Sequence, residues 1–176
     1  MFAAIHDTFG EPADVLDARD IERPEPGSGE ALIRMVLSPI HNHDLWTIRG
    51  SYGYKPPLPG AIGGSEALGI VEAVGEGVDE ALIGKRVITD GWLRDWDAPL
   101  AKDRTGYFGS ECDGGFAQYT KTDYRNVAVV DSLLSDAELA TFACSYSTAE
   151  GMLNRANVGK DDRVLITGAS GGVGSA

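Results

Sequence analysis

The strongest constraint on the fold is an apolar run that leads directly into a glycine-rich turn near the end of the chain. Residues 163–167 read RVLIT, and residues 168–174 read GASGGVG. Glycines at this spacing after a buried strand let the backbone turn tightly and approach a pyrophosphate. The pattern predicts a strand over Arg163–Thr167 and the first turn of a βαβ dinucleotide-binding fold. The alternative is a flexible linker.

The first 130 residues show short apolar runs separated by Gly, Pro and Asp clusters, a pattern typical of a partly closed antiparallel β-structure. A long irregular loop is predicted over 92–110, where the sequence has no period. The predicted strands are Phe2–His6, Ala31–Ser38, Ala67–Val74, Arg86–Thr89, Gly115–Thr120 and Asn126–Val130.

Three helices are predicted. A short one over His43–Arg49 has Asn42 as its candidate N-cap. Ser135, with Glu138 three residues later, predicts a capped helix that runs to Cys144. A third helix is expected over Ser147–Ala156. The fold class is therefore mainly β with α.

Charge and composition exclude several classes of function. The chain has 15 Lys and Arg against 27 Asp and Glu, a formal net charge of −12, which opposes binding to nucleic acid or to anionic membranes. No window approaches the roughly 18 apolar residues of a membrane span, and no signal-peptide pattern opens the chain. Cys112 and Cys144 are isolated, so neither a disulfide framework nor a cysteine-rich zinc lobe is expected. A cytoplasmic protein is predicted.

Four segments together resemble the medium-chain dehydrogenase/reductase superfamily, in particular its quinone oxidoreductase and enoyl thioester reductase branches. They read ERPEPGSGEALIRM, SPIHNHDLWTIRGSYG, GGSEALGIVEAVGEGV with the following GKRV, and DDRVLITGASGGVGSA. The resemblance implies a GroES-like β-barrel catalytic domain over 1–130. Residues 131–176 would then hold linking helices and the first strand and turn of a Rossmann domain, most of which lies beyond this chain.

The same resemblance implies a nicotinamide cofactor, NADP(H), and a small-molecule substrate. The residues expected to bind the cofactor are Gly168, Ser170, Gly171, Gly172, Val173, Gly174 and Thr148. With only the first part of a Rossmann domain, the chain is expected to bind a dinucleotide weakly. A homodimer is a possible assembly.

Zinc alcohol dehydrogenases of the superfamily carry a catalytic metal, and the matching positions here are His41, Ser65 and Cys144. Serine is a poor zinc ligand, so zinc is not expected. A site built from His41, Glu66 and Cys144 is chemically possible and stays open as the minor alternative.

Without zinc, a reductase needs another group to stabilise negative charge on the substrate oxygen. Tyr52 matches the position of the catalytic tyrosine in enoyl thioester reductases, and His41 and Asp44 belong to the polar cluster of residues 41–44. The sequence thus predicts an NAD(P)H-dependent oxidoreductase that reduces a quinone, activated alkene or carbonyl. The alternatives are a zinc alcohol dehydrogenase-like enzyme and a truncated, recombined or designed chain without catalysis of its own.

Overall fold

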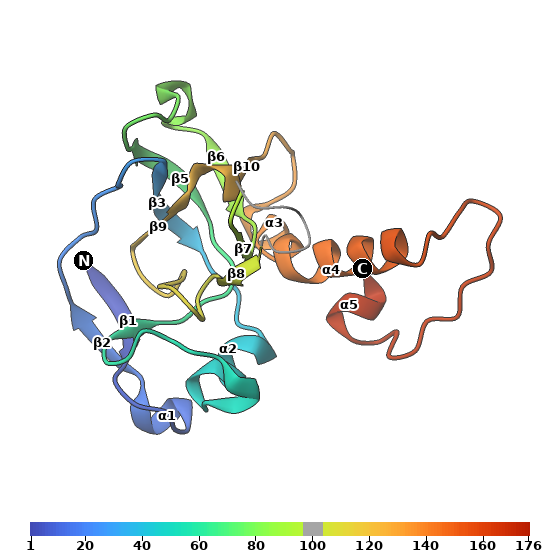
Figure 1. The fold of residues 1–176 in the computed structure, drawn as a ribbon, viewed down its shortest axis with the longest axis horizontal. Coiled ribbons are helices and arrows are strands. Elements are labelled where there is room, and N and C mark those ends of the chain that lie inside the picture. The colour runs from blue at the N-terminus through green and yellow to red at the C-terminus, as the bar shows by residue number, and fades with distance from the viewer. Residues whose placement is uncertain (97–103) are drawn as a thin grey trace.

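The computed structural model describes residues 1–96 and 104–176. Its main body is a partly open barrel made of a three-stranded and a five-stranded antiparallel sheet (Figure 1). The strand order is β2-β1-β4 in the first sheet and β10-β6-β5-β3-β9 in the second. The two sheets meet at an Ala3–Ala117 bridge, beside which the Ala4 amide donates to the Phe116 carbonyl over 2.8 Å. This mainly β body with added helices confirms the predicted fold class.

The strands are β1 Phe2–His6, β2 Asp17–Asp20, β3 Glu30–Leu37, β4 Ala61–Ile62, β5 Leu68–Val74, β6 Arg86–Thr89, β7 Trp92–Arg94, β8 Arg104–Tyr107, β9 Tyr119–Asp123 and β10 Val127–Val129. The α-helices are α1 Pro12–Val15, α2 Asn42–Ile48, α3 Asp136–Leu139, α4 Phe142–Arg155 and α5 Gly172–Ser175. Short 3-10 helices cover Ser51–Gly53, Glu80–Leu82 and Tyr124–Asn126. No described helix has the length and apolar character needed to cross a bilayer.

The inward faces of the strands form the core, because alternate residues of a strand point to the same face. One cluster joins Ala31 and Ile33 of β3 to Val71 of β5 and Val87 of β6. Gly69 of β5 pairs with Met35 of β3. A Cβ atom there would fall on the Arg34 carbonyl oxygen, so only glycine fits this register.

Three predicted helix boundaries are wrong, among them the start of the third helix, α4, which begins at Phe142 rather than at Ser147. The residue that caps α2 is His41 rather than Asn42, and the His41 amide donates to the Asp44 carboxylate over 2.7 Å. Ser135 does cap α3, with the reciprocal Glu138 bond that was predicted. However, α3 ends at Leu139 rather than Cys144, and Cys144 belongs to the next helix, α4.

Three predictions about strands and loops also need correction. Residues 92–110 are not one irregular loop, because β7 and β8 pair as a two-stranded sheet within them; residues 97–103 lie outside the described part. The strand expected over Gly115–Thr120 is found later, at Tyr119–Asp123.

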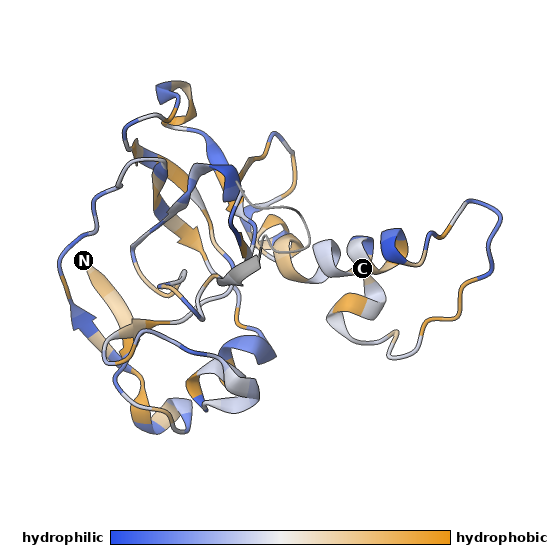
Figure 2. Cartoon of the chain, in the orientation of Figure 1, coloured by the Kyte–Doolittle hydropathy of each residue, from blue (hydrophilic) through white to orange (hydrophobic). Residues whose placement is uncertain are grey.

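The strand predicted over Arg163–Thr167 is also absent, because no described strand lies beside it to complete its hydrogen bonds. After α4 the chain forms an extended loop that carries apolar stretches and returns to α5 (Figure 2). Leu165 keeps 89% of its surface exposed there.

Candidate functional site

A cleft of about 590 Å³ lies where the barrel faces α4. Its walls come from α2, from β6 with the following β7–β8 hairpin, and from one side of α4. In Figure 1, α4 extends away from the barrel beside this hairpin. The lining residues that matter most below are His43, Tyr54, Ser65, Tyr107, Cys144 and Thr148.

An imidazole between two phenol rings forms one wall of the cleft. The His43 ring lies 4.5 Å from the Tyr54 ring and 5.5 Å from the Tyr107 ring, measured between centroids. Burial lowers the pKa of His43, so this imidazole is neutral at pH 7. A neutral imidazole has one N–H donor and one nitrogen acceptor. This wall therefore combines apolar surface with a polar group.

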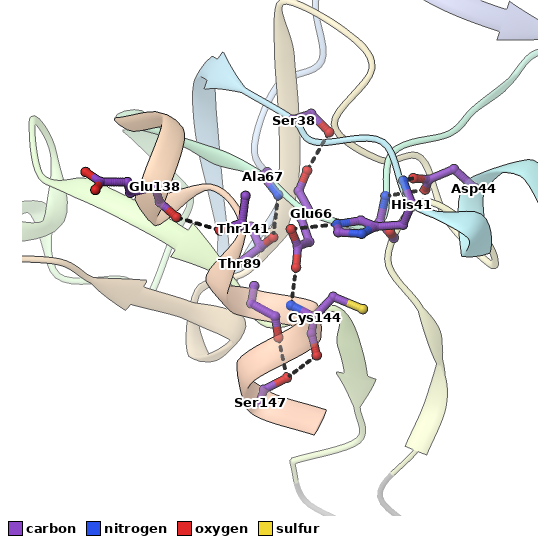
Figure 3. A network of polar contacts seen from close by, with 12 residues as sticks. Ser38, His41, Asp44, Glu66, Ala67, Thr89, Glu138, Thr141, Cys144 and Ser147 are labelled. Atoms are coloured by element: carbon purple, nitrogen blue, oxygen red, sulfur yellow. Dashed lines mark hydrogen bonds and ion pairs between the residues drawn. The ribbon is translucent and has the colours of Figure 1, made fainter. Parts of the chain in front are cut away.

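Glu66 is the centre of the polar network shown in Figure 3. Its side chain is only 1% exposed, and its Oε2 lies 2.9 Å from His41 Nε2. Its Oε1 accepts a hydrogen bond from the backbone N–H of Cys144, in the first turn of α4. The hydrogen bond to Glu66 raises the pKa of His41. One buried carboxylate thus connects α4 to the barrel and to the loop before α2.

Asp44 is also fully buried, and both of its oxygens accept backbone hydrogen bonds. Oδ2 accepts from the His41 amide over 2.7 Å, and Oδ1 accepts from the Ser65 amide over 2.8 Å. These bonds fix the start of α2 against the segment that carries Ser65 and Glu66. The geometry shows Asp44 holding these two segments together, and its catalytic role stays a prediction.

The structure brings His41, Glu66 and Cys144 together, but their donor atoms do not suit a zinc ion. Both Glu66 oxygens already accept hydrogen bonds, one of them from the Cys144 backbone. Burial, and then the charges of Glu66 and Asp44, raise the pKa of the Cys144 thiol. Within residues 1–96 and 104–176, no three His, Cys, Asp or Glu side chains are arranged to hold a metal.

Tyr52 lies apart from the residues that line the cleft. It has a left-handed backbone, with φ of 57°, and 77% of its surface is exposed. Its ring packs edge-on against Trp46 of α2, with centroids 5.0 Å apart. A non-glycine residue in this conformation is strained and is often found at a functional site. Its assignment as the proton donor stays a prediction.

The glycine-rich turn leads into α5, which packs against α4. Gly168 has φ of 66°, and its carbonyl oxygen accepts from the Gly171 amide over 2.9 Å. A Cβ atom on Gly174 would fall on that same carbonyl oxygen and lie 2.8 Å from Ala169 Cα, so the turn requires glycine there. Of the predicted cofactor-binding residues, Thr148 lines the cleft, whereas the turn itself lies outside its lining.

Sequence reasoning missed the wall formed by His43, Tyr54 and Tyr107. These residues come from α2, from the segment after Gly53 and from β8, so no local pattern joins them. The only signal in the sequence was that His43 lies inside the polar cluster of residues 41–44.

Comparison with known proteins identifies the family. Residues 27–132, more than half of the chain, match the alcohol dehydrogenase GroES-like domain. Acryloyl-coenzyme A reductase of Metallosphaera sedula is 32% identical over 90% of this chain and 49% of its own length. An NAD-dependent alcohol dehydrogenase of Sulfolobus acidocaldarius is 30% identical over 99% of this chain and 53% of its own length.

The solved structures agree with this family. A cobalt- and zinc-bound thermostable alcohol dehydrogenase of Pyrobaculum aerophilum matches 99% of this chain and 53% of its own, with a TM-score of 0.86 and 30% identity. The chain spans about half the length of the relatives it matches. It belongs to the alcohol dehydrogenase GroES-like domain family of the medium-chain dehydrogenase/reductases.

Proposed function

We propose that this chain provides the substrate-binding half of an NAD(P)H-dependent oxidoreductase that reduces a carbonyl, an activated alkene or a quinone without a catalytic zinc ion. The observation that carries the proposal is the cleft between the barrel and α4. It combines apolar walls with a few polar groups, as small-molecule sites do, and it lacks a set of zinc ligands among the described residues. The names of the relatives support both reductase and dehydrogenase chemistry.

The glycine-rich turn fits a dinucleotide. Gly171 and Gly172 are exposed, and the turn has no space for a side chain at position 174. Because no side chain covers these positions, a diphosphate can approach the main chain closely. When bound, a dihydronicotinamide supplies the hydride, and NADP(H) is the proposed form. Ser170 and Val173 belong to the same turn, and Thr148 would contact the cofactor from α4.

The residues of this chain bind and orient the substrate. Asp44 fixes the His41 loop against the Ser65 segment, and Glu66 sets the position of α4. The polar wall of the cleft contacts the substrate oxygen, and Tyr52 remains the proposed proton donor. A small-molecule substrate, a cytoplasmic location and a homodimer complete the proposal.

The test is a fluorescence titration of the purified chain with NADPH and NADH. We expect weak, saturable binding that the Gly174→Ala substitution abolishes, because the added methyl group collides with the Gly168 carbonyl. Gly159→Ala is the matched control, because a Cβ atom at Gly159 meets only the Asp162 carboxylate at 3.6 Å, which is an ordinary contact. If the wild-type chain shows no saturable binding, the proposal fails for this chain and a non-catalytic role remains. One equivalent of tightly bound zinc would instead favour the alcohol dehydrogenase-like alternative.

A further inference from the structure

One face of α4 lines the cleft from the barrel outward. Cys144, Thr148, Gly151 and Arg155 all line it, and their spacing of three or four residues places them on one side of the helix. At a rise of 1.5 Å per residue, Cys144 and Arg155 lie about 16 Å apart along the helix axis. The cleft therefore has an inner end at the barrel, near Cys144, and an outer end at Arg155.

The outer end consists of an indole ring with two guanidinium groups close to it. The Cζ atom of Arg94 lies 5.7 Å from the centre of the Trp92 ring, and the Cζ atom of Arg155 lies 5.9 Å from it. A guanidinium within about 6 Å of an indole centre is attracted by the electrons of the ring. These contacts hold Arg155, an exposed residue at the end of α4, against β7 and at the cleft.

The two arginines differ in their ion pairs. Arg94 Nη2 lies 3.2 Å from Asp90 Oδ2, and Asp90 is the one carboxylate among the described residues that line the cleft. In the part of the chain that the structure describes, no carboxylate lies within ion-pair distance of Arg155. The outer end thus carries one positive charge that is not neutralised, in a chain with a net charge of −12.

This charge and the surface beside it select the kind of ligand. A guanidinium donates two parallel hydrogen bonds to a carboxylate, and a single carboxylate matches the single excess charge. The acidic chain opposes a phosphate monoester more strongly, because that group carries a larger negative charge. Ile88, Ala128 and Met152 add apolar surface to the cleft, which suits a hydrocarbon chain.

We infer that Arg155 and Trp92 form a subsite for a carboxylate at the far end of an elongated substrate, whose reacting group lies at the inner end of the cleft. This inference rests on the proposed function and deepens it, since it names the class of substrate. That class consists of carbonyl compounds or activated alkenes whose apolar chain ends in a carboxylate. Arg155 binds the carboxylate directly, Arg94 adds positive charge beside it, and Trp92 holds Arg155 in place.

The test compares octanoate with octanamide, its neutral analogue of the same length, as ligands of the full chain without cofactor. The readouts are the NMR signals of the Trp92 indole N–H and of the Arg155 Nε–H. The wild type should bind octanoate about fivefold more tightly than octanamide. Octanoate binding should weaken as the salt concentration rises, whereas octanamide binding should stay constant. The amide corrects for apolar binding that does not depend on charge.

Arg155→Gln should abolish the preference for octanoate and leave octanamide binding unchanged. Arg163→Gln is the matched control, because it removes the same charge from an exposed arginine outside the cleft lining. It should retain the preference. The inference is overturned if the wild type binds the two ligands equally, if Arg155→Gln keeps the preference, or if both substitutions reduce it to the same extent.

A titration with NADPH separates the substrate from the cofactor as the source of the anion. Arg155→Gln should bind NADPH within twofold of the wild type. If the substitution weakens NADPH binding and leaves the preference for octanoate intact, Arg155 serves the cofactor and the inference is overturned.

The proposed function can fail separately. A preference for octanoate that depends on Arg155, without any NADPH binding, would support the subsite and reject the reductase proposal for this chain. NADPH binding without a preference for octanoate would do the opposite.

Discussion

Replacing Glu66 by glutamine tests whether one buried carboxylate stabilises the junction between the barrel and α4. The substitution keeps the size of the side chain and leaves an amide oxygen to accept from the Cys144 N–H. It removes the negative charge that faces His41 Nε2 at 2.9 Å. A protonated imidazole then meets an amide group that cannot serve both partners at once.

The size of the effect follows from the hydrogen bond and from pH. A hydrogen bond to a charged group contributes about 1.5–3 kcal/mol, and His41 keeps 20% of its side chain exposed, so we expect about 2 kcal/mol. Glu66 raises the pKa of His41 in the folded state. The stabilisation from this pair is therefore complete below about pH 6.5, the unfolded value, and is lost as the pH rises through the raised pKa.

Urea unfolding at about pH 5.5 and about pH 8.5 measures this difference directly. Glu66→Gln should lower the free energy of unfolding by about 2 kcal/mol at the lower pH and by about 1 kcal/mol at the higher pH. Glu138→Gln is the control, because Glu138 bonds to Ser135 and to no histidine. Its effect should be the same at both pH values. An equal effect of Glu66→Gln at the two pH values would refute the reasoning.

Three further predictions concern the barrel, a buried thiol and zinc. Gly69→Ala should lower the free energy of unfolding by about 2 kcal/mol or more in urea, because its methyl group has no space beside the Arg34 carbonyl. Gly151→Ala in α4, where a Cβ meets nothing and the backbone is helical, should not lower it. Burial raises the pKa of Cys112 to about 11, so iodoacetamide at about pH 8 should modify it about 100-fold more slowly than a free thiol, as mass spectrometry of the peptide will show. Dialysis against a chelator should leave the melting temperature unchanged, whereas a loss of more than a few degrees would contradict the poor fit of the residues to zinc.

The sequence predicted those strands whose apolar pattern is local. β1 and β6 were predicted with the bounds that the structure has, because each is a short apolar run between turn residues. β7 and β8 were missed, since their residues are charged and aromatic and, among the described strands, each pairs with the other alone. β9 begins later than predicted because the amides of Gly115 and Phe116 donate to the Gly64 and Gly63 carbonyls, which belong to no strand.

The site was predicted in part for a similar reason. The cluster around His41, Asp44 and Glu66 was visible as polar residues next to a short helix and a strand, and the resemblance pointed to Cys144. The assignment of hydrogen bonds to each oxygen depends on contacts between elements far apart in the chain, such as Glu66 and Cys144, which are 78 positions apart. No periodic pattern in the sequence indicates such contacts. For the same reason, the wall formed by His43, Tyr54 and Tyr107 could not be predicted.

The bond from Glu66 to the first turn of α4 also has a geometric consequence. α4 makes one continuous helix of 14 residues, and the glycine-rich turn packs at its side. A helix of that length spans about 20 Å, so a small rotation at its first residues displaces the far end by several ångströms. Glu66 therefore fixes the direction in which α4 leaves the barrel, and a change at this residue can alter the width of the cleft without disturbing the buried clusters of the barrel.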